Sequence, residues 1–196
     1  MRPFRYSRPN DPAVAIQTVA GNQSAKFLAG GTNLLDLMKE DVARPNELID
    51  ISRLNLTEIR QTAGGISIGA LAKNKDTANH TLVRQNYPLL SRAILAGASA
   101  QIRNMATNGG NLMQQVRCWY FYDVALPCNR HEPGSGCSAI AGLNQRQAIF
   151  GYSENCVAVN PSDMSVALAA LDAVVKVRGL NGKERSIPLT GFHLLP

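Results

Sequence analysis

Residues 26–38 constrain the fold of this chain more than any other stretch. Their letters, KFLAGGTNLLDLM, predict a short strand, a glycine turn and the start of a helix. Gly30 and Gly31 have no Cβ and can adopt positive φ, so the backbone there can approach a bulky anion closely. Thr32 or Asn33 would be the N-cap, and the unpaired N–H groups of the first helical turn favour a diphosphate. The stretch predicts a nucleotide-phosphate cradle, with an ordinary strand-to-helix turn as the alternative.

A second glycine-rich stretch, residues 107–113 (TNGGNLM), repeats the paired glycines beside Thr and Asn. Neither stretch matches the G-x-G-x-x-G fingerprint of dinucleotide-binding proteins, and no Lys-Ser or Lys-Thr pair follows as in a P-loop. An extended dinucleotide has two ends to hold, and two such turns could cover its diphosphate from both sides. Two unrelated turns are the alternative interpretation.

Composition and charge exclude several classes of protein. A chain of 196 residues with 45% apolar content is long enough for one well-buried domain or two small ones. No apolar run reaches the length of a membrane helix, so membrane insertion is not expected.

The net charge of +6 comes from scattered Lys and Arg residues, without a basic run or an RNA-binding aromatic pattern, so no nucleic-acid partner is expected either. The N-terminal residues lack the apolar core of a signal peptide, which predicts a cytoplasmic chain or periplasmic export in company with a partner subunit.

The order of predicted elements up to about residue 56 is strand, helix, strand, helix, strand, which is typical of a small parallel α/β unit. Asp11-Pro12 predicts the start of the first helix. Beyond that unit we expect a strand at 66–70, helices at 76–84 and 88–100, and a helix that opens at 161–163 with Ser162 as its N-cap. Asn181-Gly182 predicts a closing hairpin.

All four cysteines lie in one segment, at positions 118, 128, 137 and 156. Their spacing matches neither a zinc-ribbon pair nor the tight ferredoxin run. The segment also carries an aromatic block at 119–122 and many Pro and Gly residues, which predicts a long functional loop. Four thiolates could hold a 4Fe–4S cluster or a zinc ion, with backbone amides near Gly134 and Gly136 donating to the sulfurs. Four reduced, buried and inert cysteines are the alternative.

Together, four motifs resemble the FAD-binding (medium) subunit of molybdenum hydroxylases of the xanthine dehydrogenase family. The resemblance covers nearly the whole chain and is carried by residues 29–35 (AGGTNLL), 101–104 (QIRN), 106–112 (ATNGGNL) and 161–163 (PSD). Within the family, the cysteine segment is most similar to the flavin subunit of periplasmic bacterial three-subunit aldehyde oxidoreductases. Asn108 departs from the pattern, because an apolar residue is common at that position.

The resemblance implies an α+β fold, the two-lobed FAD-binding domain of the CO dehydrogenase flavoprotein type. It implies a small parallel α/β lobe at residues 1–57 and a larger mixed α+β lobe at 58–180, which contains the cysteine insertion 114–157. Residues 181–196 would begin a linker. Family members continue beyond the position of Pro196 into a C-terminal domain that covers part of the flavin ring. The resemblance therefore implies that this domain is truncated, supplied by another chain or missing.

The resemblance also implies the site residues. Two cofactors are implied, FAD and a 4Fe–4S cluster. The implied FAD contacts lie in the two glycine-rich stretches and at one acidic position: Lys26, Phe27, Leu28, Ala29, Gly30, Gly31, Thr32, Asn33, Leu34, Leu35, Thr107, Gly109, Gly110, Asn111 and Asp163. The implied cluster ligands are the four thiolates: Cys118, Cys128, Cys137 and Cys156.

The activity implied by the resemblance is that of an FAD-dependent oxidoreductase subunit that performs no carbon chemistry itself. The implied partners are a small subunit with two 2Fe–2S clusters, a large molybdopterin-binding subunit that oxidises an aldehyde, and an external electron acceptor. One alternative is an assembly subunit of the same complex that keeps the cluster and binds no usable FAD. Another is a zinc-containing nucleic-acid-binding protein.

Overall fold

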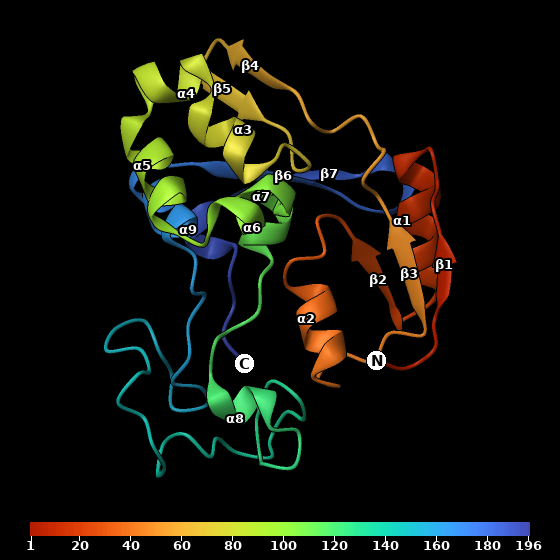
Figure 1. Cartoon of the computed structure of the whole chain (residues 1–196), viewed down its shortest axis with the longest axis vertical. Helices are drawn as coiled ribbons and strands as arrows, with labels where there is room; N and C mark the ends of the chain where they lie inside the picture. The colour runs from red at the N-terminus through yellow and green to blue at the C-terminus, as the bar shows by residue number, and fades with distance from the viewer.

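The N-terminal part is a three-stranded parallel sheet with the strand order β1-β3-β2 (Figure 1). The computed structural model describes every residue from Met1 to Pro196. The elements of this part are β1 (Arg5–Ser7), α1 (Pro12–Gly21), β2 (Ala25–Leu28), α2 (Leu34–Lys39) and β3 (Glu47–Asp50). The side chain of Asp11 accepts a hydrogen bond from the Ala13 N–H at the start of α1, and Pro12 takes the first position, as the sequence predicts. The predicted parallel α/β unit is confirmed.

The second part combines short helices with an antiparallel strand pair. Its elements are β4 (Ile59–Thr62), β5 (Gly65–Ile68), α3 (Asn74–Asn79), α4 (Thr81–Asn86), α5 (Pro88–Ala96), α6 (Ala100–Met105), α7 (Asn108–Leu112) and α9 (Asp163–Ala170). Two predictions need correction here: the helix expected at 76–84 is split at His80, and the second glycine turn is the short helix α7. Strand β4 was not predicted. His80 has extended backbone, and its Nδ1 accepts from the Leu82 N–H, which starts a new helix.

A C-terminal hairpin connects the two parts. Strands β6 (Val174–Arg178) and β7 (Glu184–Pro188) pair antiparallel around the 3₁₀ turn η1 (Leu180–Gly182). Asn181 and Gly182 both have positive φ, which is the backbone that the predicted Asn-Gly turn requires. The η1 turn lies against α1, and the short 3₁₀ turn η2 (Leu189–Gly191) lies against α9. The hairpin therefore crosses residue 180, where we expected a lobe boundary.

The insertion at 114–157 projects from the rest of the chain as a loop lobe, whose one helix is α8 (Trp119–Tyr122) (Figure 1). Three buried clusters hold the molecule together: one under the parallel sheet, one between α3, α5 and α9, and one in the insertion. The insertion cluster contains Leu37 of α2 together with Phe121 and Ala139, so the loop lobe packs on the N-terminal part. No helix has the length and apolarity needed to cross a bilayer.

Candidate functional site

The two glycine-rich segments, which we call the first segment (29–35) and the second segment (107–113), meet in space. A Cβ built on Gly30 would lie 2.0 Å from the carbonyl oxygen of Met105 and 3.2 Å from the Cα of Ala106. Only a residue without a side chain fits there. Gly30 therefore serves close packing between the first segment and the chain that leads into the second.

Backbone N–H groups of the first segment make no hydrogen bond within the protein from Ala29 through Leu34. Gly31 has φ +75, which makes a sharp turn between β2 and α2 and is the conformation that glycine adopts without strain. Asn33 stands at the N-cap position of α2 without capping it. Its Oδ1 accepts from the Gln115 N–H at 3.0 Å, while its Nδ2 is buried and has no partner. Free backbone N–H groups and an unpaired side-chain amide are the donors with which a turn of this kind can bind an anion.

The second segment differs, because its N–H groups from Asn108 to Asn111 are occupied. The Asn108 N–H donates to the Ala72 carbonyl at 3.0 Å, and the Gly109 N–H donates to the Ala70 carbonyl at 2.7 Å. The Gly110 N–H donates to the Thr107 hydroxyl, which caps α7. A Cβ on Gly109 would stand 3.1 Å from the Ala70 oxygen, so this glycine too permits close packing. A run of free backbone N–H groups is therefore present in the first segment and absent from the second.

Helix α9 places Asp163 near the second segment. Ser162 is the N-cap, as predicted, and its hydroxyl accepts from the Ser165 N–H and donates to the Asn111 Oδ1. The exposed Asp163 carboxylate lies 3.5 Å from where a Cβ on Gly97 would be, at the end of α5. Asn111 keeps its side chain within the protein, because its Nδ2 donates to the Asn74 Oδ1 at 3.0 Å.

Lys26 and Phe27 are exposed on β2 at the sheet edge, and Leu28 and Ala29 are partly buried. These residues lead directly into the first segment. Leu34 and Leu35 begin α2, and the Leu35 side chain covers the position that a Cβ on Gly31 would take. The exposed Thr32 stands between Gly31 and Asn33.

A polar group at the carboxyl end of the sheet was not predicted from the sequence. Asp50, the last residue of the central strand, is 4% exposed and accepts hydrogen bonds from the Tyr6 hydroxyl, the Arg8 Nε and the Ser52 N–H. Burial alone would raise the pKa of Asp50, but the hydrogen bonds from Tyr6, Ser52 and Arg8 outweigh it and hold that pKa well below its usual range. The sequence feature that could have indicated this group is an acidic residue at the end of an apolar strand.

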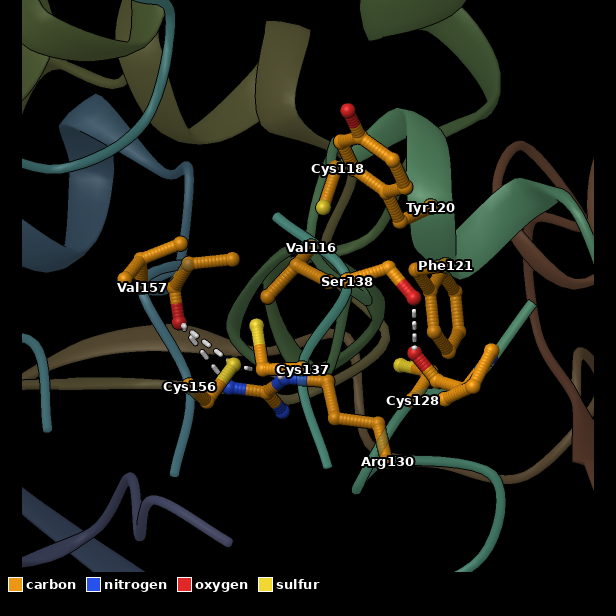
Figure 2. A pocket seen from close by; sticks show the side chains of 12 residues that line it. Val116, Cys118, Tyr120, Phe121, Cys128, Arg130, Cys137, Ser138, Cys156 and Val157 are labelled. Carbon is orange, nitrogen blue, oxygen red and sulfur yellow. Dashed lines mark hydrogen bonds between the residues drawn. The ribbon is translucent and has the colours of Figure 1, made fainter. Parts of the chain in front are cut away.

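The four cysteines line a single cavity in the insertion, as Figure 2 shows. Cys128 and Cys137 face each other through an isolated β-bridge, and Cys118 and Cys156 are buried beside them. Burial raises the pKa of the Cys128 thiol, and the nearby thiols of Cys118 and Cys156 raise it further. The structure therefore gathers all four predicted ligands, although they are separated by long loops in sequence.

Arg130 reaches into this cavity (Figure 2). Its Nε lies 3.3 Å from the Cys156 sulfur, and its Nη2 donates to the Ala158 carbonyl at 3.1 Å. One expectation is wrong: the amides of Gly134 and Gly136 do not point at sulfur. Both donate to the Asn129 Oδ1, at 3.0 and 2.9 Å, because positive φ at both glycines curls the loop around that side chain.

The donor set suits a soft metal centre, because four thiols are the ligand set of iron–sulfur clusters and Cys₄ zinc sites. The cavity itself is small, about 10 Å³, which is room for about one water. No group of three His, Cys, Asp or Glu side chains is arranged to hold one metal ion. A 4Fe–4S cluster binds each thiolate through a different iron, so it would need the four sulfurs to surround a centre wider than this cavity.

A family model described as the FAD binding domain in molybdopterin dehydrogenase matches residues 2–196. The chain belongs to this family. Its curated relatives include the aldehyde oxidoreductase FAD-binding subunit PaoB of Escherichia coli K12, which is 52% identical over the whole chain. The glyceraldehyde dehydrogenase medium chain of Sulfolobus acidocaldarius is 35% identical over 55% of this chain and 38% of its own length.

Solved structures of the family share the fold. Carbon monoxide dehydrogenase from Hydrogenophaga pseudoflava matches 98% of this chain with a TM-score of 0.70 and 27% identity, and the match covers 53% of that protein's chain. Quinoline 2-oxidoreductase from Pseudomonas putida 86 matches with a TM-score of 0.69 over 97% of this chain and 52% of its own, and at 23% identity it supports the fold alone. The family and the two-lobed fold of the CO dehydrogenase flavoprotein type, both predicted from the motifs, are confirmed. The chain spans 62% of the length of PaoB and about half of these solved chains.

Proposed function

We propose that this chain holds FAD as the electron-transfer subunit of a molybdenum-containing aldehyde oxidoreductase. The observation that carries the proposal is the run of unpaired N–H groups at residues 29–34, which lies against the entrance to the second segment. The orphaned Nδ2 of Asn33 adds a donor at the same turn. A diphosphate would satisfy these donors, and membership of an FAD-binding family specifies FAD as its source.

The chain's own residues would bind and orient the flavin. Residues 26–35 would hold the diphosphate and ribityl parts, and Thr107, Gly109, Gly110 and Asn111 would close the site from the other side. Asp163, exposed at the first position of α9, would make a polar contact to the adenosine or ribose portion. Bound FAD would accept electrons from iron–sulfur clusters of a partner subunit and deliver them to an external acceptor. Aldehyde oxidation would take place on a separate molybdopterin-binding subunit, as the 52% identity to PaoB suggests.

Exposed apolar surface supports the proposed partners. The accessible surface is 12,119 Å², whereas a compact monomer of 21.1 kDa exposes about 9,000 Å². Several large apolar side chains of the insertion are almost fully exposed, among them Leu143 (80%), Ile149 (79%) and Phe150 (86%). Contiguous exposed apolar surface marks protein–protein contacts, and Ile149 and Phe150 are adjacent in the chain. We therefore include the 2Fe–2S and molybdopterin subunits in the proposal.

We propose a 4Fe–4S cluster at the cavity lined by Cys118, Cys128, Cys137 and Cys156. The support is that one cavity gathers every cysteine of the chain, with the Arg130 guanidinium at its edge. A cationic guanidinium beside a sulfur compensates the negative charge that four thiolates bring to the cluster.

The test is to purify the chain with its partner subunits without air and to measure flavin and iron on each chain. The proposal predicts one extractable FAD, flavin absorption bands over a broad iron–sulfur background, and a 4Fe–4S signal in electron paramagnetic resonance. Iron without flavin would instead indicate an assembly subunit. Zinc, together with salt-sensitive binding of DNA or RNA, would refute the proposal in favour of a nucleic-acid-binding protein.

A further inference from the structure

A chain of polar side chains runs through the second part of the molecule, beneath the proposed FAD site. It consists of Thr77, Asn108, Asn74, Asn111 and Ser162. The Asn108 Nδ2 donates to the Thr77 hydroxyl at 2.7 Å, and the Asn74 Nδ2 donates to the Asn108 Oδ1 at 3.0 Å. The Asn111 Nδ2 donates to the Asn74 Oδ1 at 3.0 Å, and the Ser162 hydroxyl donates to the Asn111 Oδ1. The chain thus joins α3, α7 and the N-cap of α9.

Burial makes this arrangement unusual. Asn74 is 2% exposed, Asn108 is 7% exposed, and Thr77 and Ser162 are also buried. Burying amides is costly unless every donor and acceptor finds a partner, and here each of the two asparagines uses both its oxygen and its nitrogen.

We propose that Asn74 is a positioning residue for the FAD site, an inference that rests on the FAD binding proposed above. The Asn74 side chain is shielded from any ligand, yet its oxygen accepts a hydrogen bond from Asn111 in the second segment. The Asn74 backbone N–H donates to the Ala106 carbonyl at 2.9 Å. The Ser162 hydroxyl donates to the other end of the Asn111 amide, and Ser162 is the N-cap of the helix that carries Asp163. Asn74 thereby fixes the second segment relative to α9, two parts of the site that come from distant points in the sequence.

The same bonds give the Asn111 side chain a structural role. Its oxygen also accepts from the Gln114 Nε2 at 3.1 Å, so both ends of its amide are occupied inside the protein. Asn111 would then contribute to FAD binding through the position of its backbone. If the Asn111 side chain instead bonded FAD directly, its hydrogen bond to Asn74 would not matter for FAD binding.

The experiment measures FAD affinity, the circular dichroism of bound flavin and apo-protein thermal stability for the full chain and its variants. The main variants are Asn74→Ala, Asn111→Ala and their double variant. Ser91→Ala is the matched control: its hydroxyl is buried, it donates to the Ala78 carbonyl at 2.7 Å between α5 and α3, and it lies outside the polar chain. We expect Asn74→Ala to lower FAD affinity about tenfold and to change the flavin dichroism. Ser91→Ala should lose stability while keeping affinity and dichroism.

The double variant distinguishes positioning from direct contact. If Asn74 acts through Asn111, the double variant binds FAD as weakly as either single variant and no more weakly, because both changes break one link. The inference would be overturned if the losses of FAD affinity in the two single variants add up in the double variant, or if Asn74→Ala binds FAD as tightly as Ser91→Ala does. Neither result would contradict the proposed binding of FAD by the wild-type chain. If Asn74→Ala does not fold, Ser162→Ala breaks the other end of the same link and must show the same loss. A wild-type chain that takes up no FAD would overturn the proposed function, and this inference with it.

Discussion

Replacing Gly30 with Ala tests the claim that the two glycine-rich segments are built to touch. The new Cβ would lie 2.0 Å from the Met105 oxygen, about 1.4 Å nearer than the 3.4 Å at which ordinary contact begins. Both contacting atoms belong to backbone, so the clash cannot be relieved by turning a side chain. The segments must separate, or the chain at Met105–Ala106 must shift.

Overpacking of this kind costs about 1–3 kcal/mol, whereas Gly to Ala at an unstrained open site stabilises by about 0.4–1 kcal/mol. Gly21→Ala is the control, because no atom lies within 4 Å of its Cβ position and its φ is ordinary. Urea unfolding followed by circular dichroism should show a loss of stability for Gly30→Ala and none for Gly21→Ala. FAD affinity should fall with Gly30→Ala as well, because the free N–H groups of residues 29–34 would move. Equal urea midpoints for the two variants would refute the packing role of Gly30.

Three further predictions concern the glycine turn, the carboxyl end of the parallel sheet and the cysteine cavity. Gly31→Val should abolish FAD binding in a titration while the chain still folds, since φ +75 strains a β-branched residue; full flavin content would contradict it. Asp50→Asn should lower stability by about 1.5–3 kcal/mol at pH 7, because hydrogen bonds to a charged acceptor are lost. Because the pKa of Asp50 is lower in the folded protein, its contribution to the free energy of unfolding is complete above the ordinary Asp pKa of about 3.9 and is lost as the pH falls towards the folded pKa. The free energies of unfolding of wild type and Asp50→Asn, measured with urea, should therefore converge at acid pH. Cys128→Ser should remove the 4Fe–4S paramagnetic signal, and an unchanged signal would show that Cys128 is no ligand.

Sequence alone predicted those elements whose signals are local. Asp11-Pro12 starts α1, Ser162 caps α9 and Asn181-Gly182 turns the closing hairpin, because each signal needs only a hydrogen bond or a backbone angle within a few residues. Strand β4 escaped prediction because its letters, IRQT, carry little apolar periodicity and depend on pairing with β5. The polar group of Tyr6, Arg8 and Asp50 escaped prediction because Asp50 lies more than 40 residues from Tyr6 and Arg8 in the chain.

The paired glycines show where local reading of a sequence stops. Both segments contain Gly-Gly beside Thr and Asn, and the same chemistry was expected of both. In the structure Gly31 supplies a positive φ, whereas Gly30 and Gly109 make room for backbone that arrives from another part of the chain. In the second segment the N–H groups of Asn108 and Gly109 donate to the carbonyls of Ala72 and Ala70, residues that no motif links to it. Which N–H groups remain free is therefore decided by long-range packing, and in the proposed FAD site the free N–H groups belong to the first segment.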